Sequence, residues 1–101
     1  MSARCVVPKR TDRNQREIVH ALRKIVATVW HTHEAGKGAP DIVVGHIGSD
    51  GIRRNYLFEI KNPKQSARDR RLTDDEEIFH ERWKGQVDVI HSFEEALEIM
   101  K

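Results

Sequence analysis

The sequence predicts one small α/β domain, with elements in the order helix, three strands, helix, strand, helix. Apolar residues recur at helical spacing near both ends of the chain. Short runs rich in β-branched residues lie between them, separated by glycine, proline and asparagine. A chain of 101 residues is long enough to bury one core, and it contains no repeat or linker that would indicate a second domain.

The first helix is predicted over about residues 13–26. Asp12 and Gln15 have the three-residue spacing of a capping box, which is typical of a helix start. Helical spacing then relates the apolar residues Ile18, Leu22, Ile25, Val26 and Val29. The pattern passes into residues 27–33, where β-branched and aromatic residues predict a strand. The glycines and proline of residues 36–40 end that strand.

A β-hairpin is predicted in the middle of the chain. Residues 41–47 are an apolar run of strand length, and residues 54–61 return as the partner strand. Between them, Gly48-Ser49-Asp50-Gly51 is typical of a hairpin turn. Asn62-Pro63 ends the second strand, because proline cannot donate a ladder hydrogen bond. A polar loop is expected to follow.

The second long helix is predicted to begin after Thr73. Thr73 and Glu76 form another capping box, so we interpret Glu76 as a structural residue and not as a metal ligand. The helix is expected to end at Gly85, a residue typical of C-terminal caps. Its apolar face consists of Ile78, Phe79 and Trp83.

A short strand and a last helix complete the predicted fold. Residues 86–91 have the length and composition of a short strand. Ser92 with Glu95 then marks the start of the final helix. The residues of this helix that are expected to face the core are Phe93, Ala96, Leu97 and Met100.

Composition alone says little about function. The formal charge of +2, from 18 Lys and Arg against 16 Asp and Glu, is too small to indicate nucleic-acid binding. The single cysteine, Cys5, excludes an internal disulfide and fits a reducing compartment, so a cytoplasmic protein is expected. No apolar stretch approaches the roughly 20 residues needed to span a bilayer. Residues 1–11 have no clear period and are expected to form a loose basic arm through Arg4, Lys9 and Arg10.

The strongest functional signal is Pro40-Asp41, followed eighteen positions later by Glu59-Ile60-Lys61. Side chains alternate between the faces of a strand, so Glu59 and Lys61 share one face while Ile60 turns to the core. Asp41 on the neighbouring strand supplies a second carboxylate for a hard cation such as Mg²⁺. A divalent ion assists phosphodiester hydrolysis because it neutralises the phosphate charge and acidifies a water. The pattern therefore favours metal-assisted phosphodiester hydrolysis.

These residues and the element order resemble the PD-(D/E)XK nuclease superfamily, which includes restriction endonucleases and has an α-β-β-β-α-β core with a mixed central sheet. The resemblance covers nearly all of the chain and is strongest to small phage-type and VRR-NUC-like members. It also rests on residues 14–19, on residues 38–45 and on Leu72-Thr73. One segment departs from the family pattern. Relatives often have glutamine shortly after the Leu-Thr pair, where this chain has Asp75, Glu76 and Glu77.

The resemblance implies an endonuclease that uses Mg²⁺ or Mn²⁺ to hydrolyse DNA. It implies that Asp41, Glu59 and the Ile60 carbonyl bind the metal. Lys61 would orient the attacking water, as a base, or stabilise developing charge. Glu17 would assist from the first helix, although a glutamate in a first helical turn is also favoured by the helix dipole.

The resemblance also suggests a substrate and an assembly. Small stand-alone relatives include junction resolvases that work as dimers, so we expect a homodimer that acts on branched, Holliday junction-like DNA. A pair of sites can cut two strands. The alternative from another functional class is a non-catalytic nucleic-acid-binding or scaffolding module that keeps the nuclease fold.

A basic segment after the predicted metal site is expected to contact phosphate. In residues 64–71, four cations stand against one anion, and the cations are Lys64, Arg68, Arg70 and Arg71. Such contacts give salt-sensitive binding with little sequence preference. His33 and Lys37 are further candidates for nucleic-acid contact.

Two other groups of residues have competing interpretations. His31 and His33 share a face of the predicted strand near Glu34, a spacing that suits zinc, but no third ligand is well placed. Trp30 and Trp83 are interpreted as core or interface residues rather than as groups that stack on bases.

Overall fold

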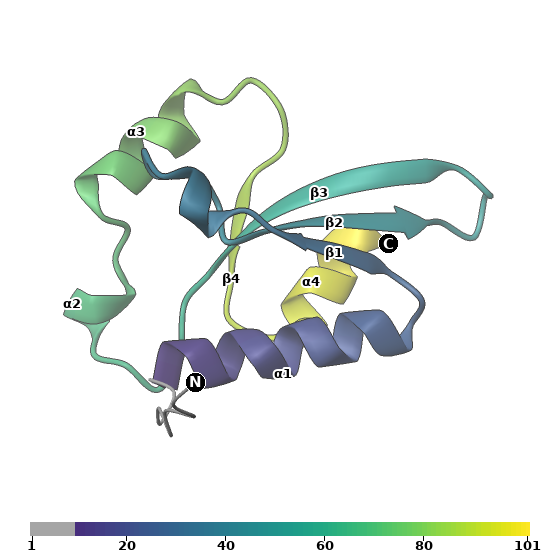
Figure 1. Cartoon of the computed structure of the whole chain (residues 1–101), viewed down its shortest axis with the longest axis horizontal. Helices are drawn as coiled ribbons and strands as arrows, with labels where there is room; N and C mark the ends of the chain where they lie inside the picture. The colour runs from purple at the N-terminus through teal and green to yellow at the C-terminus, as the bar shows by residue number, and fades with distance from the viewer. Residues whose placement is uncertain (1–9) are drawn as a thin grey trace, which may run out of the picture.

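The computed structural model describes residues 10–101 and confirms the predicted order of elements, with the addition of two short helical segments (Figure 1). The helices are α1 (Arg10–Lys24), α2 (Ala67–Arg70), α3 (Asp74–Arg82) and α4 (Phe93–Met100), with a 3-10 turn, η1, at His33–Ala35. The strands are β1 (Thr28–His31), β2 (Ile42–Ile47), β3 (Arg53–Ile60) and β4 (Asp88–Ile90). Cys5 and the predicted basic residues Arg4 and Lys9 lie outside the described residues. Within residues 10–101, every helix is too short or too polar to cross a membrane.

The four strands form one mixed sheet in the order β1-β2-β3-β4. β2 pairs antiparallel with both β1 and β3, whereas β3 and β4 are parallel. α1 and α4 lie together on one face of this sheet (Figure 1). α2 and α3 lie at the end of the sheet that is remote from the turn between β2 and β3 (Figure 1). The predicted α/β class with a mixed central sheet is therefore confirmed.

The apolar core lies between the sheet and the helices α1 and α4. Its largest fully buried side chains are Phe58, Leu22, Ile42, Ile90 and Val44. Alternate residues of a strand share a face, so the buried apolar residues of β2 and β3 all point toward the two helices. Burial of each side chain of this size stabilises the folded state by roughly 1.5–3 kcal/mol relative to leaving it exposed. The opposite face of β3 is therefore free to carry polar groups.

Three apolar side chains that were candidates for the core are exposed, which excludes the core but not the interface interpretation of Trp30 and Trp83. Trp30 is 70% exposed, because it alternates on β1 with Val29, which packs against the core. Trp83 is 46% exposed and follows α3, a helix without buried residues. Leu97 is 37% exposed, since it lies one helical step from the buried Ala96.

Element ends in the first half differ from the prediction for local backbone reasons. α1 begins at Arg10, so Asp12 lies inside the helix and not at its N-cap. The helix stops at Lys24, and Val26 then adopts a left-handed backbone with φ of 65°. His33 lies in the 3-10 turn η1 and not on the predicted strand.

The second half contains one unpredicted helix and one wrong cap. The expected polar loop includes the short helix α2, which begins at the N-cap Ser66. α3 ends at Arg82, where the chain becomes extended, so the predicted cap at Gly85 is wrong. The last capping signal is confirmed, because Ser92 Oγ accepts a hydrogen bond from the Glu95 amide at 3.2 Å.

Candidate active site

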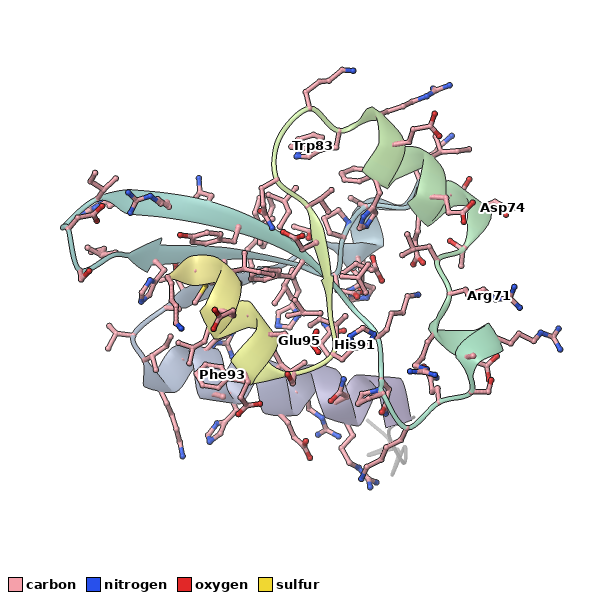
Figure 2. The ribbon with its side chains drawn as sticks, turned by 180° about the vertical axis from the view of Figure 1, so that it is seen from behind. Arg71, Asp74, Trp83, His91, Phe93 and Glu95 are labelled. Atoms are coloured by element: carbon pink, nitrogen blue, oxygen red, sulfur yellow. The ribbon has the colours of Figure 1, made fainter. Side chains whose placement is uncertain are left out.

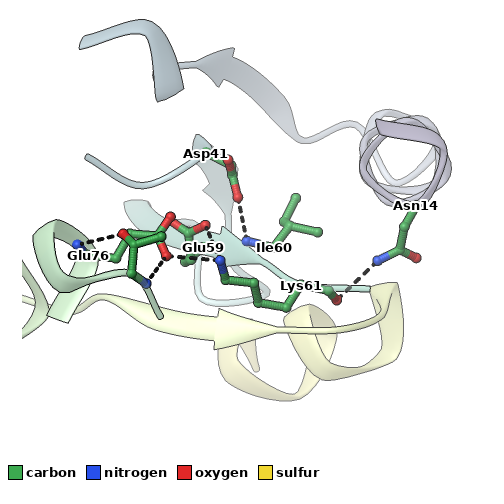
Figure 3. A network of polar contacts seen from close by, with 7 residues as sticks. Asn14, Asp41, Glu59, Ile60, Lys61 and Glu76 are labelled. Carbon is green, nitrogen blue, oxygen red and sulfur yellow. Dashed lines mark hydrogen bonds and ion pairs between the residues drawn. The ribbon is translucent and has the colours of Figure 1, made fainter. Parts of the chain in front are cut away.

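Asp41 and Glu59 meet because the hairpin register places them opposite each other. Ile42 pairs with Phe58 at the open end of the hairpin, so the next positions in the same register are Asp41 and Glu59. The backbone N–H of Ile60 donates a hydrogen bond of 2.7 Å to Asp41 Oδ2 (Figure 3). The backbone of β3 thus fixes the carboxylate that precedes β2.

A pocket of about 390 Å³ lies over these two carboxylates. The elements that surround it are the first half of α1, the end of β1, the end of β3 and the start of α3. Its lining consists of Gln15, Arg16, His31, His33, Asp41, Glu59, Ile60, Lys61, Gln65, Asp69 and Glu76. The fold therefore brings both predicted carboxylates and the predicted lysine into one pocket.

Glu59 is strongly perturbed by this environment. The residue is 3% exposed, and its Oε1 is buried without a hydrogen-bond partner among the described residues. Burial raises the pKa of Glu59 to about 9, helped by the hydrogen bond and charge of Asp41 and by the charge of Glu76. The positive charge of Lys61 offsets only part of this effect. Without a bound cation, Glu59 therefore holds a proton at neutral pH.

Lys61 lies between two acidic side chains of the pocket and pairs closely with one of them, Glu76. Its Nζ lies 2.9 Å from Glu76 Oε1 and 3.8 Å from Glu59 Oε2 (Figure 3). Burial disfavours the charged lysine, but the hydrogen bond and charge of Glu76 outweigh burial and raise the pKa of Lys61. In this arrangement Lys61 is an ammonium group, which suits it to stabilise an anionic oxygen rather than to accept a proton.

Glu76 has two roles, of which sequence reasoning found one. The predicted capping box is confirmed, with the Thr73 amide 2.9 Å from Glu76 Oε1 and the Glu76 amide 3.2 Å from Thr73 Oγ1. The same Oε1 also accepts the hydrogen bond from Lys61. Burial opposes the charge of Glu76, but the hydrogen bonds from Lys61 and Thr73 outweigh burial and lower its pKa. The signal in the sequence was an acidic residue where relatives often have glutamine.

Asp41, Glu59 and the Ile60 carbonyl are the oxygen-bearing groups of the pocket that could hold a hard cation. The N–H and C=O of one residue in a strand point to the same edge. The Ile60 N–H points to Asp41, whereas the next amide, that of Lys61, bonds Ile90 on β4 at 3.0 Å. The Ile60 carbonyl is therefore directed to the Asp41 side, and the unpartnered Glu59 Oε1 adds a further oxygen. Oxygen donors of this kind suit Mg²⁺ or Mn²⁺.

The structure provides no third side chain for the alternative zinc site. Among the side chains described, from residue 13 onward, no group of three His, Cys, Asp or Glu is gathered as metal ligands. The Nδ1 of His31 lies 3.2 Å from Gln15 Nε2, so this ring nitrogen already has a polar partner. His33 lines the pocket but lies on the 3-10 turn.

Helix α1 does not bring Glu17 to the pocket. Gln15 and Arg16 line the pocket, whereas Glu17 lines a neighbouring hollow of about 300 Å³. Successive residues of a helix are rotated by about 100° around the helix axis. Gln15 and Glu17 are two positions apart, so they point to nearly opposite sides of α1. The rotation of α1 is set by the burial of Ile18 and Leu22 against the sheet. The sequence alone could not relate this rotation to the position of the pocket.

The predicted nucleic-acid contacts are spread over several places. Lys64 lines the same neighbouring hollow as Glu17, and Lys37 lies in another hollow beside α3. The basic segment also contains three arginines, Arg68, Arg70 and Arg71. Their side chains are exposed and do not line the pocket over the carboxylates. The side chain of Arg71 extends outward from the molecule (Figure 2).

Comparison with known proteins identifies a solved structure with a similar fold. No family model matches the chain, and no curated protein matches its sequence. Among solved structures, the chain is similar to a VRR-NUC domain with a TM-score of 0.62 and 21% identity, over 91% of this chain and 95% of that one. The chain has the VRR-NUC fold. The predicted resemblance to VRR-NUC-like members of the PD-(D/E)XK superfamily is therefore confirmed for the fold.

Proposed function

We propose that the protein is a divalent-metal-dependent endonuclease that hydrolyses phosphodiester bonds of DNA. The observation that carries the proposal is the pair Asp41 and Glu59, opposed across the hairpin beside the Ile60 carbonyl and Lys61. The VRR-NUC fold supports it, since the similar solved structure is a domain of that nuclease type.

The acidic centre fits Mg²⁺ or Mn²⁺ through Asp41, Glu59 and the Ile60 carbonyl. Two carboxyl groups in contact are unfavourable when both are ionised, and here a proton on the buried Glu59 relieves the repulsion. A cation held at the same oxygens would replace that proton. When bound, the ion supplies charge neutralisation for the phosphodiester and acidifies a water.

The remaining polar groups of the pocket support the negative charge that develops during hydrolysis. Lys61 is 12% exposed at its side chain, so its ammonium charge is weakly screened by solvent. A fixed charge in such a setting stabilises an anionic transition state more strongly than in water. Glu76 positions this ammonium group from the first turn of α3. We therefore assign Lys61 the role of an electrostatic clamp.

Branched DNA of the Holliday junction type is the proposed substrate, and a homodimer is the proposed working form. One such site cuts one strand, so paired cuts across a junction require two copies related by symmetry. Ile78 of α3 and Trp83, the residue that follows this helix, are exposed apolar side chains that are available to a second copy. The interface interpretation of Trp83 is therefore retained within this proposal.

A cleavage assay tests the function. We would incubate the protein with purified Mg²⁺ or Mn²⁺ and with single-stranded, duplex, nicked and four-way DNA. We expect Asp41→Ala, Glu59→Ala and Lys61→Ala to abolish cleavage and Glu77→Ala, at an exposed acid of α3, to leave it unchanged. Wild-type protein that binds DNA without cutting it would favour the non-catalytic module, and cleavage by Glu59→Ala at the wild-type rate would refute the metal site.

A further inference from the structure

The pocket over the carboxylates carries an excess of negative charge. Four acidic side chains line it, and they are Asp41, Glu59, Asp69 and Glu76. Lys61 is already paired with Glu76. A bound divalent ion would offset two of these negative charges. The pocket would then have little net positive charge with which to attract a phosphodiester. A nucleic-acid strand therefore needs additional cations beside the pocket to be held there.

Such cations lie on the first half of α1 and on the segment after β3. Arg16 lines the pocket itself, while Arg13 and Lys64 line the neighbouring hollow of about 300 Å³ against one carboxylate, Glu17. Arg13 and Arg16 are three residues apart, so they lie on the same side of the helix. All three cations are exposed, and none is joined to a carboxylate among the side chains described from residue 13 onward.

The two hollows adjoin each other along one stretch of chain. Lys61 lines the pocket over the carboxylates, and the next residues, 62–64, line the neighbouring hollow. This stretch passes beside the first turns of α1 (Figure 1). Asn14 fastens it there, because its Nδ2 donates to the Lys61 carbonyl at 3.2 Å (Figure 3). The same Nδ2 also donates to the His91 carbonyl at 3.4 Å. The path from one hollow to the other is therefore a fixed part of the fold.

We propose that Arg13, Arg16 and Lys64 bind successive phosphates of the nucleic-acid strand that enters the pocket. The inference rests on the proposed nuclease function and adds the course of the substrate to it. Arginine binds phosphate through a planar fork of donors, and lysine binds it as a point charge. Contacts of this kind hold the backbone and read no base. We name these three residues the α1 track.

The cations of α2 have a different place. Asp69 lines the pocket, so its helical neighbours Arg68 and Arg70 turn about 100° away from it. These exposed side chains attract DNA at a distance, while the α1 track lies next to the reacting phosphate. Loss of the α1 track should therefore lower both affinity and cleavage of bound DNA, whereas loss of the α2 cations should lower affinity only.

Matched pairs of charge removals on one helix test this inference. Arg13→Gln/Arg16→Gln removes two track residues, and Arg23→Gln/Lys24→Gln removes two exposed cations from the last turn of α1. The second pair lies about 14 Å further along the helix axis. The probes are a labelled single-stranded oligonucleotide and its duplex. Binding is measured in Ca²⁺ over a salt series, and single-turnover cleavage is measured in Mg²⁺ at saturating DNA.

For the track pair we expect the log-log salt slope to fall by about 1.4 on the single strand and about 1.8 on the duplex, with slower cleavage. The control pair should keep the wild-type slope and rate. Equal losses in both pairs, or an unchanged slope in the track pair, would overturn the α1 track. Lys64→Gln, in a loop, repeats the test with a loss of about 0.7–0.9 if the helix variant fails to fold. Wild-type protein that binds neither these probes nor a four-way junction would instead refute the proposed function.

Discussion

We expect Glu59→Gln to stabilise the metal-free protein, and to do so more strongly as the pH rises. The pKa of Glu59 is raised from an ordinary value of 4.5 to about 9 in the fold. Between these two values the folded protein holds a proton that the unfolded chain has released. The folded state therefore binds more protons, and its stability falls as the pH rises through this window. Glutamine has a similar shape, can donate to Asp41, and has no proton to lose.

The magnitude follows from the width of this window. Each pH unit inside it lowers the free energy of unfolding of the wild type by about 1.4 kcal/mol. From about pH 5 to pH 8 the wild type should therefore lose on the order of 4 kcal/mol relative to Glu59→Gln. A small domain is stabilised by roughly 5–15 kcal/mol in total, so the effect is a large share of its stability.

Urea unfolding in the presence of EDTA, repeated across this pH range, measures the effect. Glu77→Gln, at an exposed carboxylate of α3, is the matched control and should follow the wild type. Parallel pH dependence of the wild type and Glu59→Gln would refute the reasoning, because Glu59 would then be ionised in the fold. Adding Mn²⁺ should flatten the pH dependence of the wild type, since a cation favours the ionised carboxylate.

Three further predictions follow from other parts of the site. Gly38→Ala should destabilise the fold by about 1–3 kcal/mol more than Gly36→Ala in urea unfolding, because both have a left-handed backbone but only a Cβ at residue 38 would overlap the Asp75 carbonyl. Equal losses would show that this close contact is unimportant. Glu76→Gln should lower the pKa of Lys61, followed by NMR, while circular dichroism shows an unchanged helix content, since glutamine also completes a capping box. An unshifted lysine would contradict the ion pair. Mg²⁺ and Mn²⁺ should support cleavage, while Ca²⁺ should support DNA binding with little cleavage because its coordination is longer and looser. Rapid cleavage in Ca²⁺ alone would argue against this ligand set.

The hairpin and its two carboxylates could be predicted from the sequence because their signals are local. Turn residues fix where the chain reverses, and the two-residue period of a strand fixes which side chains share a face. With these two facts, Asp41 and Glu59 are expected on neighbouring strands and Lys61 on the same face as Glu59. The structure places all three in one pocket.

Features that depend on packing between distant elements could not be predicted in this way. The rotation of α1 about its axis directs Gln15 and Arg16, and not Glu17, to the pocket. The position of α3 relative to β3 brings Glu76 within 2.9 Å of Lys61. Trp30 illustrates the same limit, since a shift of one residue along a strand exchanges core for solvent.

A single oxygen atom, Glu76 Oε1, accepts hydrogen bonds from both the Thr73 amide and the Lys61 ammonium group. The first turn of α3 and the position of the lysine are therefore thermodynamically linked. Fraying of that turn releases Lys61, and an anion that draws Lys61 away weakens the cap. Occupation of the pocket would then appear as faster amide hydrogen exchange at Thr73, the N-cap residue of α3. The start of α3 can thus serve as a natural reporter of substrate in the pocket.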